Sequence, residues 1–246
     1  MVSGDGDCLA IGGNHFIHIL RRNVDVNILL LNNKIYGLTK GQYSPTSDRG
    51  AVTKSSPYGT VEDPFIPAEL TFGARGHFFA RAIDVDLEVS KECMIAAGRH
   101  KGAAGVEILQ NCVIFNDKIH SYVADREFRA DRTIHLRQGE KMLFGKNMDK
   151  GLILDGYKLK AVTVGENGIT LDDILTHDAT TANDIMHQML AMMDGHELPL
   201  AVGVIRDVEA PTYDKEVEAQ VNAVRSKKPN KTLRDLLLEG ETWEVK

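Results

Sequence analysis

Three short apolar segments in the first half of the chain have the length and composition of buried strands. Val26–Leu31 reads VNILLL, which is continuously apolar and rich in branched residues. The segments 77–83 (HFFARAI) and 105–110 (GVEILQ) show the same kind of pattern. A short apolar run of this kind predicts a strand that is buried on both of its faces.

Helical segments separate these strands. A helix is predicted over about Leu9–Arg22, where two arginines suit the C-terminal end, and another begins in FIPAEL at 65–70. A third helix covers 86–100 and is closed by Gly102. Strands that alternate with helices predict an α/β fold: a doubly wound parallel sheet with helices on both faces.

The alternation of strands and helices fades after about Lys118. The remaining predicted elements are, in order, short strands and turns at 143–164, a helix near Thr181–Met193, a strand at 198–205 and a charged tail from about Glu216. We therefore predict two domains. Residues 1–118 form the parallel-sheet domain, and residues 119–246 form a mixed C-terminal extension packed on it.

Composition and charge narrow the class of protein. Of the 246 residues, 43% are hydrophobic and 26% are charged, and the net charge of -6 leads us to expect no nucleic acid and no membrane surface as a partner. Apolar runs such as Ile28–Leu31 are far too short to span a bilayer, and the N-terminus lacks the pattern of a signal peptide. The three cysteines are too few for a disulfide framework, which favours a cytoplasmic protein.

The first residues with a chemical signal are Gly4-Asp5-Gly6-Asp7, directly ahead of the first predicted helix. A tight glycine turn whose aspartates cap that helix is one interpretation. Two nucleotide-binding motifs do not match, because GxGxxG would require glycine where Leu9 stands, and a Walker loop would require GKS or GKT. An EF-hand loop does not match either, since its third carboxylate, central glycine and closing glutamate are missing.

The spacing to the next unusual pair, Asn32-Asn33, favours a ligand site. Asp5 lies 28 residues before Asn33, which leaves room for one helix and one strand. A helix of about 14 residues advances ~21 Å and a strand of about 6 residues returns ~20 Å, so the two side chains meet at the carboxyl edge of the sheet. The Asp5 carboxylate, the Asn33 amide oxygen and one backbone carbonyl would suit Mg²⁺ that bridges a diphosphate, and the Gly-flanked helix N-terminus offers N–H groups to the phosphates.

A GDG motif followed at this distance by NN is the signature of thiamine diphosphate enzymes. The longer string at 4–47, GDGDCLAIGGNHFIHILRRNVDVNILLLNNKIYGLTKGQYSPTS, closely resembles the β subunit of 2-oxoacid:ferredoxin oxidoreductases, particularly the branch that uses 2-oxoglutarate. The resemblance continues through SSPYGTVEDPF at 55–65 and EILQNCVIFND at 107–117, and it covers nearly the whole chain. It implies that the parallel sheet is of the thiamine diphosphate-binding type.

The resemblance also implies a cofactor site and a reaction. Mg²⁺ would be held by Asp5, Asn33 and the carbonyl of Ile35, and the backbone around Gly6 and Asp7 would lie near the phosphates of thiamine diphosphate. The reaction would be the oxidative decarboxylation of a 2-oxoacid to an acyl-coenzyme A, with electrons passed to ferredoxin. In this family the glutamate that activates the aminopyrimidine ring comes from the partner α subunit, so no catalytic glutamate is assigned here.

Two further residues have competing interpretations. Residues 32–64, dense in Gly, Pro, Ser and Thr, predict a long loop, which in a compact domain is usually functional. Lys40 in this loop is either a solvated lysine or a charge that faces the distal carboxylate of a dicarboxylic 2-oxoacid, and the family's GLTKGQ context supports the second interpretation. His15 is either an ordinary histidine of the first helix or a residue that faces the cofactor.

The family carries a further segment ahead of GDGD, and we expect that this chain lacks it, because Met1-Val2-Ser3 cannot supply a whole strand before the turn. That segment contains a CxxC-type run and another cysteine. With those three thiolates, Cys112 would be the fourth ligand of a [4Fe–4S] cluster. Cys8 and Cys93 do not match ligand positions of the family and are expected to be buried thiols. The chain by itself is therefore expected neither to assemble the cluster nor to act as an oxidoreductase.

Two alternatives to this interpretation stay open. The chain could belong to an enzyme of the same type that acts on pyruvate or another 2-oxoacid. It could also be a non-catalytic chain that binds Mg²⁺ and thiamine diphosphate, or only a partner subunit. Under the leading interpretation its partners are the α subunit, ferredoxin, a 2-oxoacid and coenzyme A.

Overall fold

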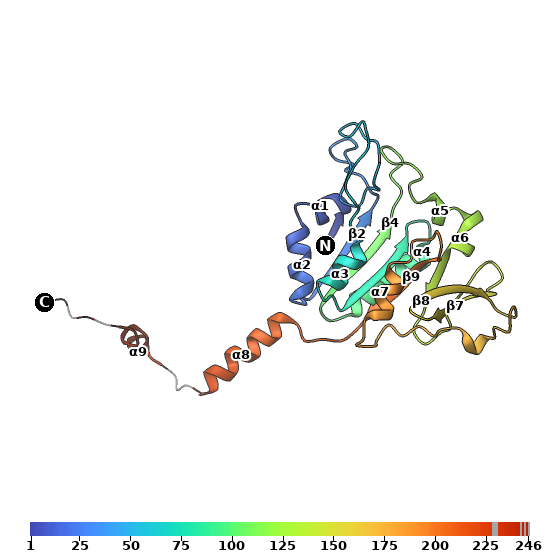
Figure 1. Ribbon diagram of the computed structural model, residues 1–246. Helices are drawn as coiled ribbons and strands as arrows, with labels where there is room; N and C mark the ends of the chain where they lie inside the picture. Colours follow the sequence, from blue (N-terminus) through green and yellow to red (C-terminus); the bar gives the residue numbers. More distant parts are fainter. Residues whose placement is uncertain (228–230, 242, 244, 246) are drawn as a thin grey trace.

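The computed structural model describes residues 1–227, 231–241, 243 and 245, and its centre is a six-stranded sheet (Figure 1). In spatial order the strands are β1 (Val2–Gly4), β2 (Val26–Asn32), β4 (Ala103–Leu109), β3 (Phe78–Ile83), β9 (Leu200–Asp207) and β5 (Thr133–Leu136). The three strands expected from the apolar segments are confirmed as β2, β3 and β4. The strand that leads into GDGD is β1, which pairs with β2.

The sheet is parallel-dominated but mixed. The strands β1, β2, β4 and β3 are parallel to their neighbours, whereas β9 is antiparallel to β3, with Arg81 opposite Gly203. The predicted α/β sheet is therefore confirmed, and the antiparallel pairing comes from β9, which belongs to the half of the chain predicted to be mixed. A helical crossover returns the chain in the same direction and makes neighbours parallel, but β9 follows the long excursion of the second half and enters from the opposite end.

Helices cover both faces of the sheet, so the doubly wound architecture is confirmed. On one face α4 (Leu87–Arg99) packs Val89, Cys93 and Ala97 against β3, β4 and β9. On the other face lie α1 (Asp5–Leu9), α2 (Gly13–Arg21), α3 (Pro67–Gly73) and α7 (Ile185–Ala191). Phe78 and Phe79 are neighbours in β3 and belong to cores on opposite faces, because successive side chains of a strand alternate.

The first helix is shorter and earlier than predicted. The helix expected over about Leu9–Arg22 is two helices: α1 begins at Asp5, and α2 begins only at Gly13. The backbone leaves the helical region at Ala10, and the chain turns so tightly that a Cβ at Gly12 would lie 2.5 Å from the Asp7 carbonyl oxygen. Glycine at this position therefore permits the turn, and Asp5 becomes the first helical residue.

The second half supplies strands to the main sheet as well as a small sheet of its own. The predicted short strands and turns are confirmed as an antiparallel sheet of β6 (Leu143–Phe144), β7 (Lys150–Asp155) and β8 (Lys158–Thr163). The other short elements are α5 (Ser121–Ala124), α6 (Arg126–Arg132) and a 3-10 turn at Leu171–Asp173. Because β5 and β9 join the six-stranded sheet, the two halves share one layer. The domain boundary after residue 118 stays a prediction.

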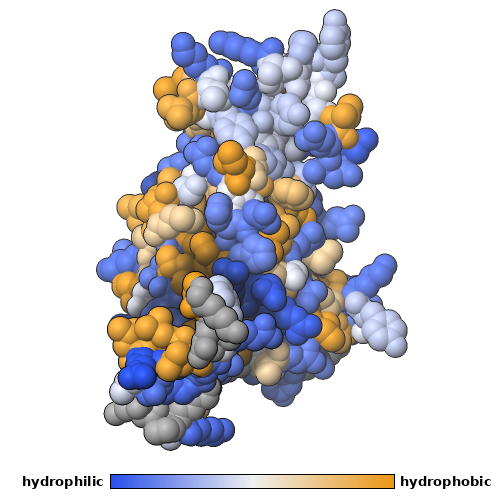
Figure 2. Space-filling view, turned by 90° about the vertical axis from the view of Figure 1, so that its left-hand side faces the viewer, coloured by the Kyte–Doolittle hydropathy of each residue, from blue (hydrophilic) through white to orange (hydrophobic). Residues whose placement is uncertain are grey.

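The end of the chain extends away from the sheet. The charged tail expected from about Glu216 is helical: α8 (Tyr213–Lys227) has no buried residue, and α9 (Leu233–Leu238) follows it (Figure 1). The face of the molecule on this side mixes hydrophobic and hydrophilic residues (Figure 2). Within the described residues, no helix has both the length and the apolar character needed to cross a membrane.

Three of the buried histidines have a lowered pKa. Burial lowers the pKa of His120, His177 and His187 below the ordinary value of 6.5, because a charged imidazole would lose its hydration. Arg206 Nη1 lies 2.9 Å from Nδ1 of His187, so this ring nitrogen is the acceptor and the ring is neutral. Protonation of His187 would put a second charge beside the guanidinium.

The fold is expected to lose stability in mild acid. The unfolded chain takes up protons as the pH falls through about 6.5, whereas the folded histidines take them up only at lower pH, so the folded state is disfavoured below about 6.5. The midpoint of urea unfolding should be lower at about pH 5.5 than at about pH 7.5. His187→Gln should flatten this dependence, and the same change at the exposed His196 should leave it unaltered. Equal midpoints at the two pH values would contradict this prediction.

Candidate functional site at the carboxyl edge of the sheet

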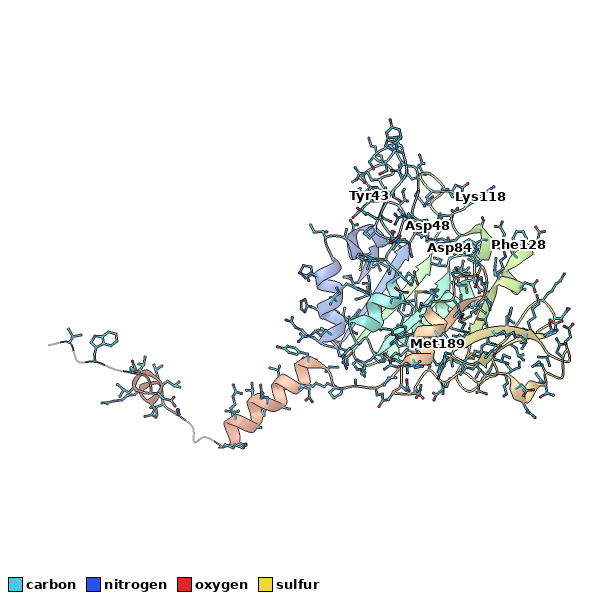
Figure 3. All side chains as sticks on the ribbon, in the orientation of Figure 1. Tyr43, Asp48, Asp84, Lys118, Phe128 and Met189 are labelled. Atoms are coloured by element: carbon cyan, nitrogen blue, oxygen red, sulfur yellow. The ribbon has the colours of Figure 1, made fainter. Side chains whose placement is uncertain are left out.

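Residues from distant parts of the chain meet where the parallel strands end. Because β1 and β2 are parallel and Gly4 is opposite Leu31, both strands end at the same edge, and Asp5 and Asn33 follow them there. The Asn33 backbone N–H donates to Asp5 Oδ1 at 3.3 Å, and Asp5 is only 1% exposed. The labelled side chains of Asp48, Asp84 and Lys118 mark this edge in Figure 3.

Oxygen atoms converge at Asn33. Its Oδ1 lies 2.8 Å from the Ile35 carbonyl oxygen and 3.1 Å from Asp5 Oδ1, and the Ile35 N–H donates to it at 3.3 Å. Three oxygens this close, one each from Asp5, Asn33 and Ile35, need a cation between them. Otherwise the Asn33 amide flips, and its NH₂ group donates to Asp5 Oδ1 and to the Ile35 carbonyl. Ligands at 2.0–2.1 Å in an octahedron around Mg²⁺ are about 2.9 Å apart. The set therefore fits Mg²⁺ when the amide oxygen faces inward, and a metal-free chain satisfies the same groups by turning the amide.

The second oxygen of Asp5 is held by the long loop. Asp5 Oδ2 accepts hydrogen bonds from Ser44 Oγ at 2.5 Å and from Thr46 Oγ1 at 2.6 Å. Ser47 Oγ donates to the Lys34 carbonyl at 2.6 Å and accepts from the Ser44 N–H at 2.8 Å, which ties the loop to the residue after Asn33. Sequence reasoning missed Ser44 and Thr46 as partners of Asp5. The only available signal was the density of hydroxyl residues in YSPTS.

The next feature of the site is the start of α1, whose first turn carries Asp5 and Asp7. No side chain caps this helix at Gly4, so the N–H groups of its first turn have no side-chain acceptor. Gly6 lies against Tyr36, whose hydroxyl donates to the Gly6 carbonyl at 2.9 Å, and a Cβ at Gly6 would lie 2.4 Å from the Tyr36 ring. Only glycine fits there. Gly6 is buried beneath Tyr36, Gly4 is half-buried and Asp7 is exposed, and the place of this backbone beside the phosphates stays a prediction.

Lys40 and His15, the other two predicted site residues, make none of the contacts described around Asp5 and Asn33. Lys40 is exposed in the loop, at a φ of 69°, and His15 is exposed on α2. Neither makes a hydrogen bond or an ion pair with Asp5, Asn33 or Ile35 among the described residues. Their roles stay predictions.

The three cysteines are separate from one another. Cys8 and Cys93 are buried thiols, as expected, and Cys112 is partly exposed after β4. Burial and then the negative charges of Asp5 and Asp7 raise the pKa of Cys8 to about 11, and burial and then Glu92 raise that of Cys93 to about 12. Throughout the part of the chain that the structure describes, no three His, Cys, Asp or Glu side chains gather as a metal site would require. The cysteines present do not fit a [4Fe–4S] cluster, which takes four thiolates.

Cys112 is expected to be the one thiol that reacts quickly in the folded chain. Alkylation needs an accessible thiolate, which burial and a raised pKa deny to Cys8 and Cys93. Iodoacetamide labelling at about pH 7.5, followed by peptide mass mapping, should modify Cys112 first, and all three cysteines should react in urea. Labelling of Cys8 as fast as Cys112 in the folded chain would contradict the burial described here.

The first part of the chain matches a known protein family. Residues 1–108 match the family model described as the thiamine pyrophosphate enzyme, C-terminal TPP binding domain. The matched range begins at β1 and ends in β4, so it includes Asp5, Asn33 and Ile35. The first part of the chain is therefore an α/β domain of the thiamine diphosphate-binding type, as the GDG and NN motifs led us to expect.

The relatives narrow the class further. The chain is 44% identical over 248 residues to 2-oxoglutarate oxidoreductase subunit KorB of Mycobacterium tuberculosis, a match that covers 100% of this chain and 66% of that relative. It is 45% identical over 109 residues to 2-oxoglutarate synthase subunit KorB of Archaeoglobus fulgidus, covering 44% of this chain and 41% of that relative. The chain belongs to the family of 2-oxoacid:ferredoxin oxidoreductase β subunits.

A solved structure agrees with this assignment. The 2-oxoglutarate:ferredoxin oxidoreductase from Magnetococcus marinus, with 2-oxoglutarate, coenzyme A and succinyl-CoA bound, is similar to this chain with a TM-score of 0.68 and 25% identity. The match covers 97% of this chain and 66% of that chain. This chain thus spans about two thirds of the length of the relatives that it matches throughout.

Proposed function

We propose that this chain is the thiamine diphosphate-binding part of the β subunit of a 2-oxoglutarate:ferredoxin oxidoreductase. The observation that carries the proposal is that the Asn33 amide lies 3.1 Å from Asp5 Oδ1 and 2.8 Å from the Ile35 carbonyl oxygen, close to the spacing of neighbouring ligands around Mg²⁺. The family match over residues 1–108 and the KorB relatives support it. When bound, thiamine diphosphate supplies the electron sink that allows a 2-oxoacid to lose CO₂.

The contribution of this chain is to hold and orient the cofactor's diphosphate. Asp5, Asn33 and the Ile35 carbonyl would bind Mg²⁺, and the uncapped first turn of α1 would donate N–H groups to the phosphates. Ser44 and Thr46 hold the Asp5 carboxylate in a single orientation through its second oxygen. Because Asp5 is buried, water competes little for the metal ligand.

The substrate and partners of the whole enzyme are part of the same proposal. We infer coenzyme A as acyl acceptor and ferredoxin as electron acceptor, because the names of the relatives and of the solved structure include them. We also infer an α subunit that supplies the glutamate for the aminopyrimidine ring, as the family resemblance implies. An iron–sulfur cluster would require cysteines beyond the three of this chain, with Cys112 as one ligand. No step is assigned to the cluster here.

The test of the proposed function is reconstitution with the partner. A version of the chain that also carries the further cysteines of the family is co-expressed with the α subunit, and 2-oxoacid-dependent reduction of a viologen dye is measured with and without coenzyme A. Reduction that requires both 2-oxoglutarate and coenzyme A is expected. A preference for pyruvate would identify a different 2-oxoacid as substrate, and binding of thiamine diphosphate without any reduction would identify a non-catalytic chain.

Lys40 is expected to favour 2-oxoglutarate over pyruvate. Its charge would face the distal carboxylate of 2-oxoglutarate, which pyruvate lacks, so only 2-oxoglutarate would lose an opposite charge when Lys40 is removed. Lys40→Ala should therefore lower kcat/KM for 2-oxoglutarate at least tenfold more than kcat/KM for pyruvate, and Lys40→Arg should retain part of the preference. Equal losses for the two substrates would assign Lys40 a general role in the loop.

A further inference from the structure

A buried line of polar side chains runs from the middle of the sheet to the metal-binding carboxylate. It begins with Arg81 on β3 and Glu107 on β4, which are register partners and are 4% and 3% exposed. Arg81 Nε donates to Glu107 Oε2 at 2.8 Å, and Asn32 Nδ2 donates to Glu107 Oε1 at 2.8 Å. Both carboxylate oxygens are therefore occupied, one by a cation and one by an amide.

Glu107 determines which way the Asn32 amide faces. An ionised carboxylate can only accept hydrogen bonds, so the NH₂ group of Asn32 must point to Glu107, and its Oδ1 points to Thr46. The Thr46 hydroxyl has one proton and two acceptors within reach, Asp5 Oδ2 at 2.6 Å and Asn32 Oδ1 at 3.0 Å, so it donates to both in one three-centre hydrogen bond whose shorter arm goes to Asp5. Arg81, Glu107 and Asn32 thus form a hydrogen-bonded relay. The hydroxyl of Thr46 lies between the last member of this relay and the carboxylate of Asp5.

We infer that Glu107, held in place by Arg81, is a positioning residue for the metal ligand Asp5 and acts on it through Asn32 and Thr46. The inference rests on the proposed function. Asn32 holds the Thr46 oxygen beside Asp5 Oδ2, and this contact leaves Asp5 Oδ1 facing Asn33 and Ile35. Groups behind metal ligands commonly set ligand orientation, and their loss weakens metal affinity about 10–100-fold.

A purely structural role of the ion pair makes a different prediction. Arg81 and Glu107 are directly opposite in the parallel pair β3 and β4, so they would meet even if the site did not use them. In that case a change at Glu107 would lower stability and would affect the metal no more than any other buried polar substitution. The effects of Glu107→Gln and Thr46→Val on metal affinity would then simply add in the double variant, because only groups that act together deviate from additivity.

The experiment measures Mn²⁺ affinity in the presence of thiamine diphosphate, from the electron paramagnetic resonance signal of free Mn²⁺, on the chain assembled with its α subunit. The variants are Glu107→Gln, Thr46→Val and the double variant. Asp5→Ala, which removes a proposed metal ligand, gives the lowest Mn²⁺ affinity expected. Thr71→Val is the matched control, because Thr71 is also a buried threonine whose hydroxyl is hydrogen-bonded, to the Pro67 carbonyl on α3. Thermal unfolding of each variant is recorded in parallel.

Glu107→Gln is expected to weaken Mn²⁺ binding about tenfold, with little additional loss when it is combined with Thr46→Val. If Glu107→Gln does not fold, Asn32→Ala cuts the same relay while it leaves the Arg81–Glu107 pair intact, and it should weaken Mn²⁺ binding to a similar extent. Two results would overturn the inference and leave the proposed function standing. One is that the effects of Glu107→Gln and Thr46→Val on Mn²⁺ affinity add up in the double variant. The other is that neither variant loses more Mn²⁺ affinity than Thr71→Val. Unchanged Mn²⁺ binding in Asp5→Ala would overturn the proposed function as well.

Discussion

Replacing Asp5 with alanine is expected to abolish Mg²⁺-dependent binding of thiamine diphosphate in the assembled enzyme. The substitution would remove one of the three proposed oxygen ligands, and the diphosphate charge would then be poorly compensated. It also leaves the hydroxyls of Ser44 and Thr46 without their shared acceptor. Isothermal titration calorimetry with the cofactor, in the presence and absence of Mg²⁺, measures the loss.

Asn33→Ala should have the same effect, because the Asn33 amide lies 3.1 Å from Asp5 Oδ1 and 2.8 Å from the Ile35 carbonyl oxygen, the other two proposed ligands. Asp155→Ala is the control, because Asp155 is an exposed carboxylate at the end of β7 that pairs with Lys160. This substitution should leave the affinity for thiamine diphosphate unchanged. Unaltered affinity in both Asp5→Ala and Asn33→Ala would rule out the metal assignment.

Replacing Arg81 with methionine is expected to lower the free energy of unfolding by about 3–5 kcal/mol. The Arg81–Glu107 pair is almost wholly enclosed, so removing the guanidinium leaves an uncompensated carboxylate in the sheet. The substitution also removes the hydrogen bond from Arg81 Nη2 to the Ala191 carbonyl, which links β3 to the end of α7. Urea unfolding at about pH 7.5 measures the change.

The exposed pair of Arg49 and Asp63 provides the comparison. These side chains are 61% and 81% exposed, so Arg49→Met should cost less than about 1 kcal/mol. The double variant Arg81→Met/Glu107→Leu should recover much of the loss, because it removes the unpaired charge. A loss in Arg81→Met no larger than that in Arg49→Met would mean that the buried pair is not needed for stability.

Several features of the site could be predicted from local patterns. The apolar runs VNILLL, HFFARAI and GVEILQ mark β2, β3 and β4, because strands buried on both faces require continuous apolar residues. The distance between Asp5 and Asn33 along the chain corresponds to one helical layer and one strand, and their meeting at the carboxyl edge followed from helix and strand dimensions. The motif pair and the longer string then indicated the family.

Other features could not be predicted from local patterns. The first helix was expected to be continuous, because the hydrophobic period does not show that Ala10 leaves the helix and that Gly12 returns to the Asp7 carbonyl. The contacts of Asp5 with Ser44 and Thr46 depend on the path of a loop that has no periodic pattern. Polar side chains in such a loop find their partners only after the sheet has brought the loop and α1 together.

The sequence by itself determined the elements that rest on local burial, and through its motifs it determined the family and the residues expected to bind the cofactor. Only the tertiary structure decided that β9 enters the sheet antiparallel to β3, and that Arg81 and Glu107 lie opposite each other behind Asn32. The physical reason is that hydrophobic periodicity records whether a residue faces the core, whereas strand order and register depend on contacts between segments far apart in the chain. The partners of a buried charge are fixed by that register.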